Sequence, residues 1–200
     1  ILACAVSGDY DPNEPFTVYD TAALEAIAGP GVYDTFVHFA WAGSAGPART
    51  DYDLQMKNAL TTVECLKTAK KLGCKRFVCA GSIMEKEVEA AVHDQGSRPG
   101  MGYIYGMGKH IAHCLCKAVA ADQGIDLIWP MITNAYGAGE LSPRFVNTTI
   151  RKIINGEPLQ FTSGTQSYDF VYVTDVARAF YLIAKNGKFA ELVERQRLDK

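Results

Sequence analysis

The feature of this 200-residue sequence that most constrains its fold is the alternation of short apolar runs with longer segments of helical period. The runs are rich in β-branched and aromatic residues, which favours strands, and the longer segments repeat apolar residues every three or four positions. Apolar strands separated by helices predict a doubly wound parallel sheet that is covered on both faces. The predicted strands are 1–6, 35–40, 75–80, 125–128 and 169–173, and the predicted helices are 19–28, 54–72, 103–121, 144–155 and 174–185.

The chemistry of such a sheet is expected beyond the carboxyl ends of its strands, because ligands of open parallel sheets bind there. Three predicted loops follow apolar strands at these places, after residues 40, 80 and 128. They contain Trp41-Ala42-Gly43, Gly81-Ser82 and the segment 133–137. We expect a binding site to be built from these residues.

Charge and composition exclude several classes of protein. The chain has 20 Lys+Arg against 22 Asp+Glu and a net charge of -2, so no basic surface is available for nucleic acid. No apolar run reaches the roughly 18 residues of a membrane span. The cysteines form no Cys-x-x-Cys pair, which predicts reduced thiols in a cytoplasmic protein. We therefore expect neither nucleic acid nor a membrane as a partner.

The most informative polar pair is Tyr105 and Lys109, four positions apart in a predicted helix. Residues i and i+4 share a helix face, so the ammonium is expected to approach the phenol and to lower its pKa from about 10. Such a phenol can act as an acid or base near neutral pH. Tyr181 and Lys185 repeat the spacing, but Tyr181 falls in an apolar stripe and is predicted to be a core residue. Only Tyr105 follows a serine at a predicted strand end, Ser82.

Two glycines, Gly106 and Gly108, lie inside the same predicted helix. Each costs a helix interior roughly 1 kcal/mol relative to alanine. They indicate either a frayed start of the helix or another group that comes close to its backbone.

Several potential metal ligands are expected to be packed side chains. His110, His113, Cys114 and Cys116 share one predicted helix, but a structural zinc site needs four ligands in closed geometry and no second cluster completes it. No metal is therefore predicted. His38 lies inside an apolar strand and is predicted to be a core histidine with a hydrogen-bond partner.

Six segments, in their order and spacing, resemble one protein family. They are Phe36-Val37-His38-Phe39-Ala40-Trp41, Asn58-Ala59-Leu60-Thr61-Thr62, Lys75-Arg76-Phe77-Val78-Cys79-Ala80-Gly81-Ser82, the Tyr105/Lys109 pair, Asn134-Ala135-Tyr136-Gly137 and Asp169-Phe170-Val171-Tyr172-Val173-Thr174-Asp175-Val176-Ala177-Arg178-Ala179. Over residues 34–185 the chain is similar to the extended short-chain dehydrogenase/reductase family, in its NAD-dependent nucleotide-sugar epimerase/dehydratase branch. The resemblance implies a Rossmann-type α/β fold with part of a small C-terminal substrate lobe.

The resemblance also implies roles for individual residues. Tyr105 matches the tyrosine that transfers protons, Lys109 the lysine that also binds the nicotinamide ribose, and Ser82 the residue that hydrogen-bonds the substrate. The implied catalytic residues are Ser82, Tyr105 and Lys109. The implied contacts to NAD or NADP come from Ala40, Trp41, Asn58, Tyr105, Lys109 and Ile132, and those to the nucleotide sugar from Ser82, Asn134 and Arg144.

The sequence departs from the family at its start. No glycine-rich phosphate loop occurs between a strand and a helix, although such a loop gives the cofactor pyrophosphate its backbone donors. We therefore expect that the first βα unit, about 50 residues of the family's domain, and some C-terminal residues are absent from this chain. Ala5-Val6 also stands where the family often has an aspartate near the adenine.

Two further departures concern the substrate. Ile83-Met84 follows Ser82 where dehydratases carry Asp-Glu, which disfavours elimination of water. Tyr168 stands where many members have an arginine for the substrate diphosphate, so Arg144 or Arg151 is expected to replace it.

The sequence therefore predicts an NAD(P)-dependent epimerase or reductase of a nucleotide-diphosphate sugar, working through a transient keto sugar. The expected parts are a partial dinucleotide-binding domain, 1–135, and a substrate-lobe segment, 136–200. A homodimer through helices 54–72 and 103–121 is expected from the resemblance.

Two alternatives stay open: a non-catalytic cofactor sensor or scaffold of the same fold, and an inactive fragment. The sugar, the base and the choice of NAD or NADP are not predicted.

Overall fold

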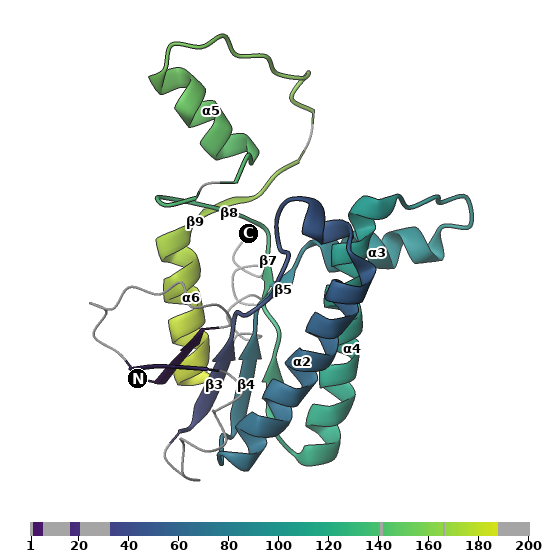
Figure 1. Cartoon of the computed structure of the whole chain (residues 1–200), viewed down its shortest axis with the longest axis vertical. Coiled ribbons are helices and arrows are strands. Elements are labelled where there is room, and N and C mark those ends of the chain that lie inside the picture. Colours follow the sequence, from purple (N-terminus) through teal and green to yellow (C-terminus); the bar gives the residue numbers. More distant parts are fainter. Residues whose placement is uncertain (1, 6–16, 21–32, 141, 166, 188–200) are drawn as a thin grey trace, which may run out of the picture.

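A parallel sheet forms the centre of the molecule (Figure 1). The computed structural model describes residues 2–5, 17–20, 33–140, 142–165 and 167–187. Strands β3 (Thr35–His38), β4 (Arg76–Cys79) and β6 (Asp126–Ile128) lie in the order β3-β4-β6, and both pairs are parallel. The predicted parallel pairing of these three apolar runs is confirmed.

Short parallel pairs extend this arrangement. Strand β5 (Gly81–Ser82) pairs with β7 (Met131–Ile132), and β8 (Asn134–Tyr136) pairs with β9 (Phe170–Tyr172). Because β5 and β7 follow β4 and β6 almost directly along the chain, the strand ends converge on one edge.

The start of the chain differs from the prediction in one element. Strand β1 (Leu2–Ala5) confirms the central part of the first predicted strand and pairs with β2 (Thr17–Asp20). The expected helix over 19–28 is therefore wrong at its first two residues, because the β-branched and aromatic run at 17–19 favours a strand. The rest of that expected helix, 21–28, lies outside the described residues.

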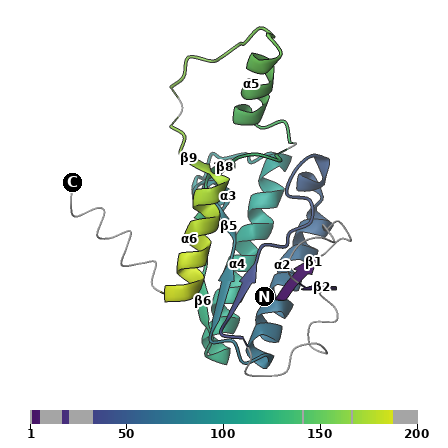
Figure 2. The same cartoon turned by 90° about the vertical axis from the view of Figure 1, so that its left-hand side faces the viewer.

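Helices cover the sheet on two sides (Figures 1 and 2). Helices α2 (Tyr52–Lys71) and α4 (Ile104–Gln123) pack side by side on one face, and α6 (Val173–Asn186) packs against β3 and β4 from the other. The core on the first face includes Leu66, Phe77 and Cys116. On the second face, Phe180 and Ile183 of α6 pack on Val78 and Ala80. This is the doubly wound arrangement that the sequence predicts.

Local signals explain where the long helices begin and end. The Asp51 carboxylate accepts from the Leu54 N–H at 3.0 Å and caps α2, which ends before Gly73 at a φ of 83°. Helix α4 ends at Gly124, which has a φ of 61°.

The structure decides between the two explanations of Gly106 and Gly108, which were a frayed start of the helix or a group that comes close to its backbone. A Cβ on Gly106 would lie 2.9 Å from the Met84 carbonyl oxygen, and one on Gly108 would lie 3.1 Å from the Gln55 carbonyl oxygen. The helix is continuous from Ile104, so close approach of neighbouring helices explains both glycines.

Two described elements lie where none was predicted. Helix α3 (Met84–His93) occupies part of the segment 83–102, which has no clear apolar stripe, and β8 lies in the predicted loop that contains the segment 133–137. Helix α5 (Phe145–Ile154) confirms the prediction over 144–155 and stands away from the sheet in Figure 1. Two single-turn 3-10 helices, η2 (Pro47–Thr50) and η3 (Met101–Tyr103), precede α2 and α4.

Helix α6 confirms the predicted helix over 174–185 but corrects one prediction about its residues. The helix begins at Val173, and no side chain caps it. Tyr181 was expected in the core but is 62% exposed, because the buried stripe runs through Phe180 and Ile183. Lys185 lies 5.8 Å from the centre of the Tyr181 ring, on the exposed side.

Candidate active site

The described structure brings Ser82, Tyr105 and Lys109 to the carboxyl end of the central sheet. Ser82 ends β5, directly beyond β4, and the first turns of α4 present Tyr105 and Lys109 on one face. All three are buried, and Lys109 is only 4% exposed. Ser82 also lies near the Tyr105 phenol, where it acts to lower the pKa of that group. The Ser82 hydroxyl from β5 and the Tyr105 phenol from α4 are therefore both buried at the same end of the sheet.

The Lys109 ammonium turns toward the strand end. Its Nζ donates to the Ala80 carbonyl oxygen at 2.9 Å and lies 3.8 Å from the centre of the Trp41 ring. Burial lowers the pKa of Lys109 to about 8, because the interior disfavours the charged form. An ammonium has three donor hydrogens, so Lys109 keeps donor capacity beyond its bond to Ala80.

The expected lowering of the Tyr105 pKa by Lys109 is wrong in this structure. Burial raises the pKa of Tyr105, while the hydrogen bond with Ser82 and the charges of Arg49 and Arg144 act in the opposite direction. Lys109 is directed elsewhere, to Ala80 and Trp41. The spacing placed the two side chains on one helix face correctly, but it could not give the direction of the lysine side chain.

Arg49 is a neighbour of the phenol that the sequence reasoning missed. Its guanidinium lies 4.0 Å from the centre of the Tyr105 ring, and its Nη1 donates to the Ser44 carbonyl oxygen at 2.8 Å. The Trp41 ring meets the Tyr105 ring edge-on, with centroids 6.2 Å apart. The only available signal was that Arg49 follows a strand end, which is too weak to select it.

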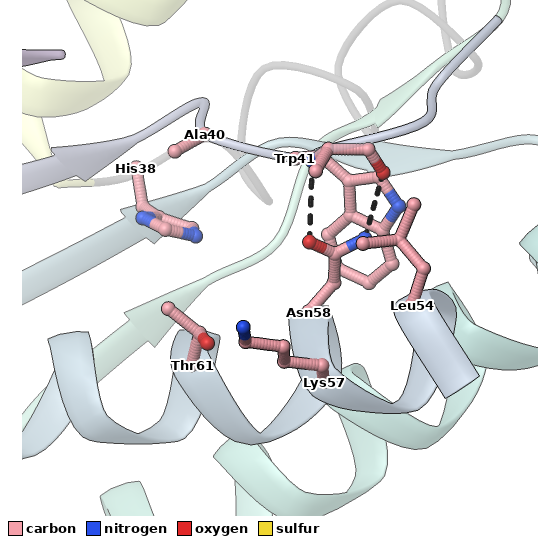
Figure 3. A pocket seen from close by; sticks show the side chains of 8 residues that line it. His38, Ala40, Trp41, Leu54, Lys57, Asn58 and Thr61 are labelled. Atoms are coloured by element: carbon pink, nitrogen blue, oxygen red, sulfur yellow. Dashed lines mark hydrogen bonds between the residues drawn. The ribbon is translucent and has the colours of Figure 1, made fainter. Parts of the chain in front are cut away.

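A pocket opens beside this group, between the end of β3 and the first turns of α2 (Figure 3). Asn58 fixes the wall of the pocket, because its side chain donates to the Ala42 carbonyl oxygen at 2.7 Å and accepts from the Ala42 N–H at 3.1 Å. Trp41 Nε1 donates to Gln55 Oε1 at 2.7 Å. The pocket is lined by His38, Ala40, Trp41, Ala42, Leu54, Lys57, Asn58 and Thr61. Three of the predicted cofactor contacts, Ala40, Trp41 and Asn58, thus lie together.

The other predicted binding residues occupy neighbouring strand ends. Ile132 lies opposite Ser82 in the β5–β7 pair, and its carbonyl oxygen accepts from the Ile83 N–H at 3.0 Å. Asn134 lies in β8, and its side chain donates to the Asp169 carbonyl oxygen at 3.4 Å. The amide of Asn134 is therefore engaged within the β8–β9 pair.

The two arginines expected to replace a substrate clamp differ in their surroundings. Arg144 is exposed just before α5, and its positive charge acts against the burial that raises the pKa of Tyr105. Arg151 donates to the backbone carbonyl oxygen of Glu140. Arg144 is therefore the one of the two that is electrostatically linked to the phenol.

Two reciprocal hydrogen bonds between Ser82 and the start of α3 were also missed. The Glu85 carboxylate accepts from the Ser82 N–H at 2.8 Å, and the Ser82 hydroxyl oxygen accepts from the Met84 N–H at 3.3 Å. Reciprocal bonds of this kind are typical of the Ser-x-x-Glu pattern at a helix N-terminus. Ser82-Ile83-Met84-Glu85 has that pattern, so the signal was present in the sequence.

Glu85 has two further partners. Trp129 Nε1 donates to Glu85 Oε1 at 3.0 Å, and His113 Nδ1 lies 3.0 Å from Glu85 Oε2. The rings of His113 and Trp129 stack with centroids 4.7 Å apart. Burial alone would raise the pKa of Glu85, but the hydrogen bonds from His113, Trp129 and Ser82 lower it overall. Glu85 is therefore a buried, charged carboxylate with hydrogen bonds to several elements.

His38 is confirmed as a core histidine with a partner. It is buried, and its Nε2 lies 3.3 Å from the Thr62 hydroxyl oxygen. Thr62 donates its own proton to the Asn58 carbonyl oxygen at 2.8 Å, so the same oxygen is left to accept from Nε2. Burial, followed by the charge of Lys109, lowers the pKa of His38 to about 4.

The described ranges hold neither a cluster of metal ligands nor a membrane-spanning helix. No three His, Cys, Asp or Glu residues there gather in a way that could hold a metal ion. Cys114 Sγ and His110 Nε2 are 3.7 Å apart on α4, as their spacing suggests. No helix within the part of the chain that is described combines the length and apolar character needed to cross a membrane.

Comparison with known proteins identifies relatives of this arrangement. Residues 13–193 match the NAD dependent epimerase/dehydratase family. The chain resembles the solved structure of MoeE5 in complex with UDP-glucose and NAD, with 24% identity and a TM-score of 0.69, covering 92% of this chain and 63% of that one.

Two 4-epimerase structures are similar to the same extent. The UDP-N-acetylglucosamine 4-epimerase from Methanobrevibacter ruminantium is 23% identical, with a TM-score of 0.69 over 88% of this chain and 60% of its own. The enzyme of that name from Bacillus cereus is 18% identical, with a TM-score of 0.72 over 92% of this chain and 63% of its own. The chain thus spans less than two thirds of the length of these structures, and at these identities the likeness shows the fold.

Proposed function

Because the chain belongs to the NAD dependent epimerase/dehydratase family, we propose that it acts as an NAD(P)-dependent epimerase or reductase on a nucleotide-diphosphate sugar. The observation that carries the proposal is the gathering of three buried polar side chains at the end of the sheet: Ser82 from β5, with Tyr105 and Lys109 from one face of α4. The substrate class is supported by similar structures, since MoeE5 was solved in complex with UDP-glucose and NAD and two others are UDP-N-acetylglucosamine 4-epimerases.

The residues beside the phenol fit a dinucleotide cofactor. Lys109 is buried with donor capacity to spare, and a pocket lies next to it at a strand end. Lys109 and Tyr105 would hold the nicotinamide ribose, while Ala40, Trp41, Asn58 and Ile132 would line the path of the cofactor. When bound, NAD or NADP would supply the acceptor and donor of hydride at a sugar carbon.

Tyr105 would take the proton of a sugar hydroxyl and return it after the reaction. Burial raises its pKa, so the phenolate needs hydrogen bonds and positive charge nearby. Ser82 supplies a hydrogen bond, and Arg49 and Arg144 supply charge. Once Tyr105 has taken the substrate proton, the single hydroxyl proton of Ser82 would be available to the oxygen of the keto sugar, which forms when the sugar hydroxyl loses its proton and the carbon its hydride.

The same site disfavours elimination of water. Ile83 and Met84 follow Ser82 where dehydratases carry two acids. Glu85, the next acid along the chain, has its carboxylate turned to Trp129 and His113 and is 1% exposed. We therefore propose epimerisation or reduction rather than dehydration, with Asn134 and Arg144 on the nucleotide-sugar side.

The division of the chain and its assembly are part of the proposal. Residues 1–135 would form the dinucleotide-binding part, and residues 136–200 would belong to the substrate lobe, with α6 returning to the sheet. A homodimer would form through α2 and α4. A cytoplasmic location is still a prediction from the cysteine content.

The first prediction tests the role of the phenol. Tyr105→Phe removes the group that carries the proton and should lower kcat by roughly 100-fold or more, a far larger effect than on NAD affinity, because Lys109 would still hold the nicotinamide ribose. The measurement is turnover of UDP-sugars with NAD and with NADP, next to a cofactor titration. Tyr181→Phe is the matched control, because Tyr181 has the same spacing to a lysine but is exposed.

The outcomes also separate the alternatives. Near-normal turnover in Tyr105→Phe would refute the mechanism. Cofactor binding by the unchanged protein without turnover of any UDP-sugar would favour a sensor or scaffold. Absence of cofactor binding would favour an inactive fragment.

A further inference from the structure

We propose that Glu85 is a positioning residue that holds in place the turn carrying the Ser82 hydroxyl beside Tyr105; this rests on the proposed function. The carboxylate lies at the first turn of α3 and accepts from the Ser82 N–H at 2.8 Å. No catalytic contact is assigned to Glu85 itself, because its oxygens face the protein interior.

Capping of α3 alone does not account for the placement of Glu85. A capping box needs only the reciprocal bonds between Ser82 and the first turn of the helix. Glu85 instead is 1% exposed and takes two more partners, Trp129 and His113, at 3.0 Å each. Burial of a carboxylate is unfavourable unless it is hydrogen-bonded and paired, so this set of partners is what allows the charge to stay inside.

The partners connect the two halves of the Ser82–Tyr105 pair. Ser82 ends β5, while His113 lies on α4, two turns beyond Tyr105. Trp129 follows β6 and stacks on His113. Glu85 therefore links the strand that carries the serine to the helix that carries the tyrosine.

Gly81 shows how closely these groups approach one another. A Cβ at this position would lie 2.9 Å from Glu85 Oε1 and would also collide with the Trp129 indole nitrogen. Glycine therefore lets the backbone before Ser82 reach the carboxylate.

The Met84 N–H gives the Ser82 hydroxyl its direction. The Ser82 oxygen accepts from that N–H at 3.3 Å, which leaves the hydroxyl proton free for donation, and Ser82 acts to lower the pKa of Tyr105. A hydrogen bond donated to the phenol oxygen favours the phenolate. Glu85 holds the backbone of this turn, so loss of its carboxylate should release the Ser82 hydroxyl from this orientation.

The test compares Glu85→Ala with Glu85→Gln in the protein with bound NAD. Removal of the side chain opens a polar site that water can fill, so folding is expected to survive. Glu85→Ala should lower kcat at least about tenfold with little change in KM, while Glu85→Gln, which keeps an acceptor oxygen, should stay within about threefold of the parent. Glu87→Ala is the matched control, because Glu87 is exposed on the same helix. Unchanged kcat in Glu85→Ala would overturn the proposal.

A double-mutant cycle distinguishes positioning from general stabilisation. If Glu85 acts through the serine hydroxyl, Glu85→Ala should cost less than about twofold in kcat when Ser82→Ala is already present. An equal loss in both backgrounds would mean that Glu85 does not act through Ser82, and would refute the proposal.

The exchange rate of the Ser82 amide hydrogen tests the structural role of Glu85 without any need for enzymatic activity. Glu85→Ala should speed exchange of the Ser82 N–H at least about tenfold, because its acceptor is removed, while Glu87→Ala should leave it unchanged. If the parent turns over no nucleotide sugar, the proposed function fails, but faster exchange would still support the structural part of the inference. Unchanged exchange in Glu85→Ala would contradict it whatever the activity.

Discussion

The buried imidazole of His38 couples the stability of the protein to pH. Its pKa falls from 6.5 to about 4 on folding, so between these values the unfolded chain binds more protons than the native one. The resulting stability is complete above pH 6.5 and is lost as the pH falls toward 4. Over this window the parent should lose up to about 3 kcal/mol more than His38→Gln.

Denaturant unfolding at a series of pH values measures this difference. His93→Gln is the control, since His93 is exposed on α3 and should leave the slope as it is in the parent. The same slope in His38→Gln and in the parent between pH 4 and 6.5 would show that His38 does not titrate as described.

At the scale of single residues, the sequence could place Ser82, Tyr105 and Lys109 but not their contacts. Strand ends and helical spacing determine where a side chain starts, whereas the bond from Lys109 to Ala80 depends on the packing of Trp41. Tyr181 shows the same limit, because one position along α6 separates it from the buried Phe180. A shift of one residue turns a side chain by about 100° around a helix.

Close packing of α4 against its neighbours makes a second prediction. In a free helix, alanine in place of glycine would stabilise by roughly 1 kcal/mol. At Gly106 and Gly108 the new Cβ would meet the carbonyl oxygens of Met84 and Gln55, so each change should instead destabilise by about 1–3 kcal/mol. Thermal unfolding measures the sign directly.

Gly102→Ala is the matched control for this pair. A Cβ at Gly102 would meet nothing within 4 Å, so its substitution should not lower the melting temperature. An increase in the melting temperature of Gly106→Ala or Gly108→Ala would show that the helices do not approach as closely as described.

Element boundaries were predictable where an apolar stripe faces the core. Helix α2 buries Ala59, Leu66 and Ala69 at helical spacing, so its prediction needed no tertiary information. Helix α3 buries Val88 and the charged Glu85, and an inward glutamate conceals the apolar face from which a helix is predicted. Strand β8 depends on pairing with β9, more than 30 residues later, which no local pattern specifies.

At the scale of the whole molecule, the parallel sheet explains why separate sequence segments build one site. The ends of β3, β4 and β6 point the same way, so Trp41, Ser82 and Trp129 come to one edge although they lie far apart in sequence. Helices α2 and α4 then supply Asn58, Tyr105 and Lys109 from one face. The convergence follows from topology, and the direction of each side chain follows from packing.

The homodimer is predicted to form through helices α2 and α4, which carry exposed apolar side chains. Ile111 and Leu115 lie four positions apart on the exposed side of α4, and Leu60 is exposed on α2. If these helices meet their copies in a dimer, Ile111→Glu with Leu115→Glu should weaken association by about 100-fold or more, because charges would be buried in an apolar interface. Sedimentation over a range of protein concentrations measures the shift toward monomer.

Leu182→Glu on α6 is the control, since α6 covers the opposite side of the sheet and its exposed leucine should have no effect. A parent that sediments as a monomer, or a double variant that stays dimeric, would rule out this interface.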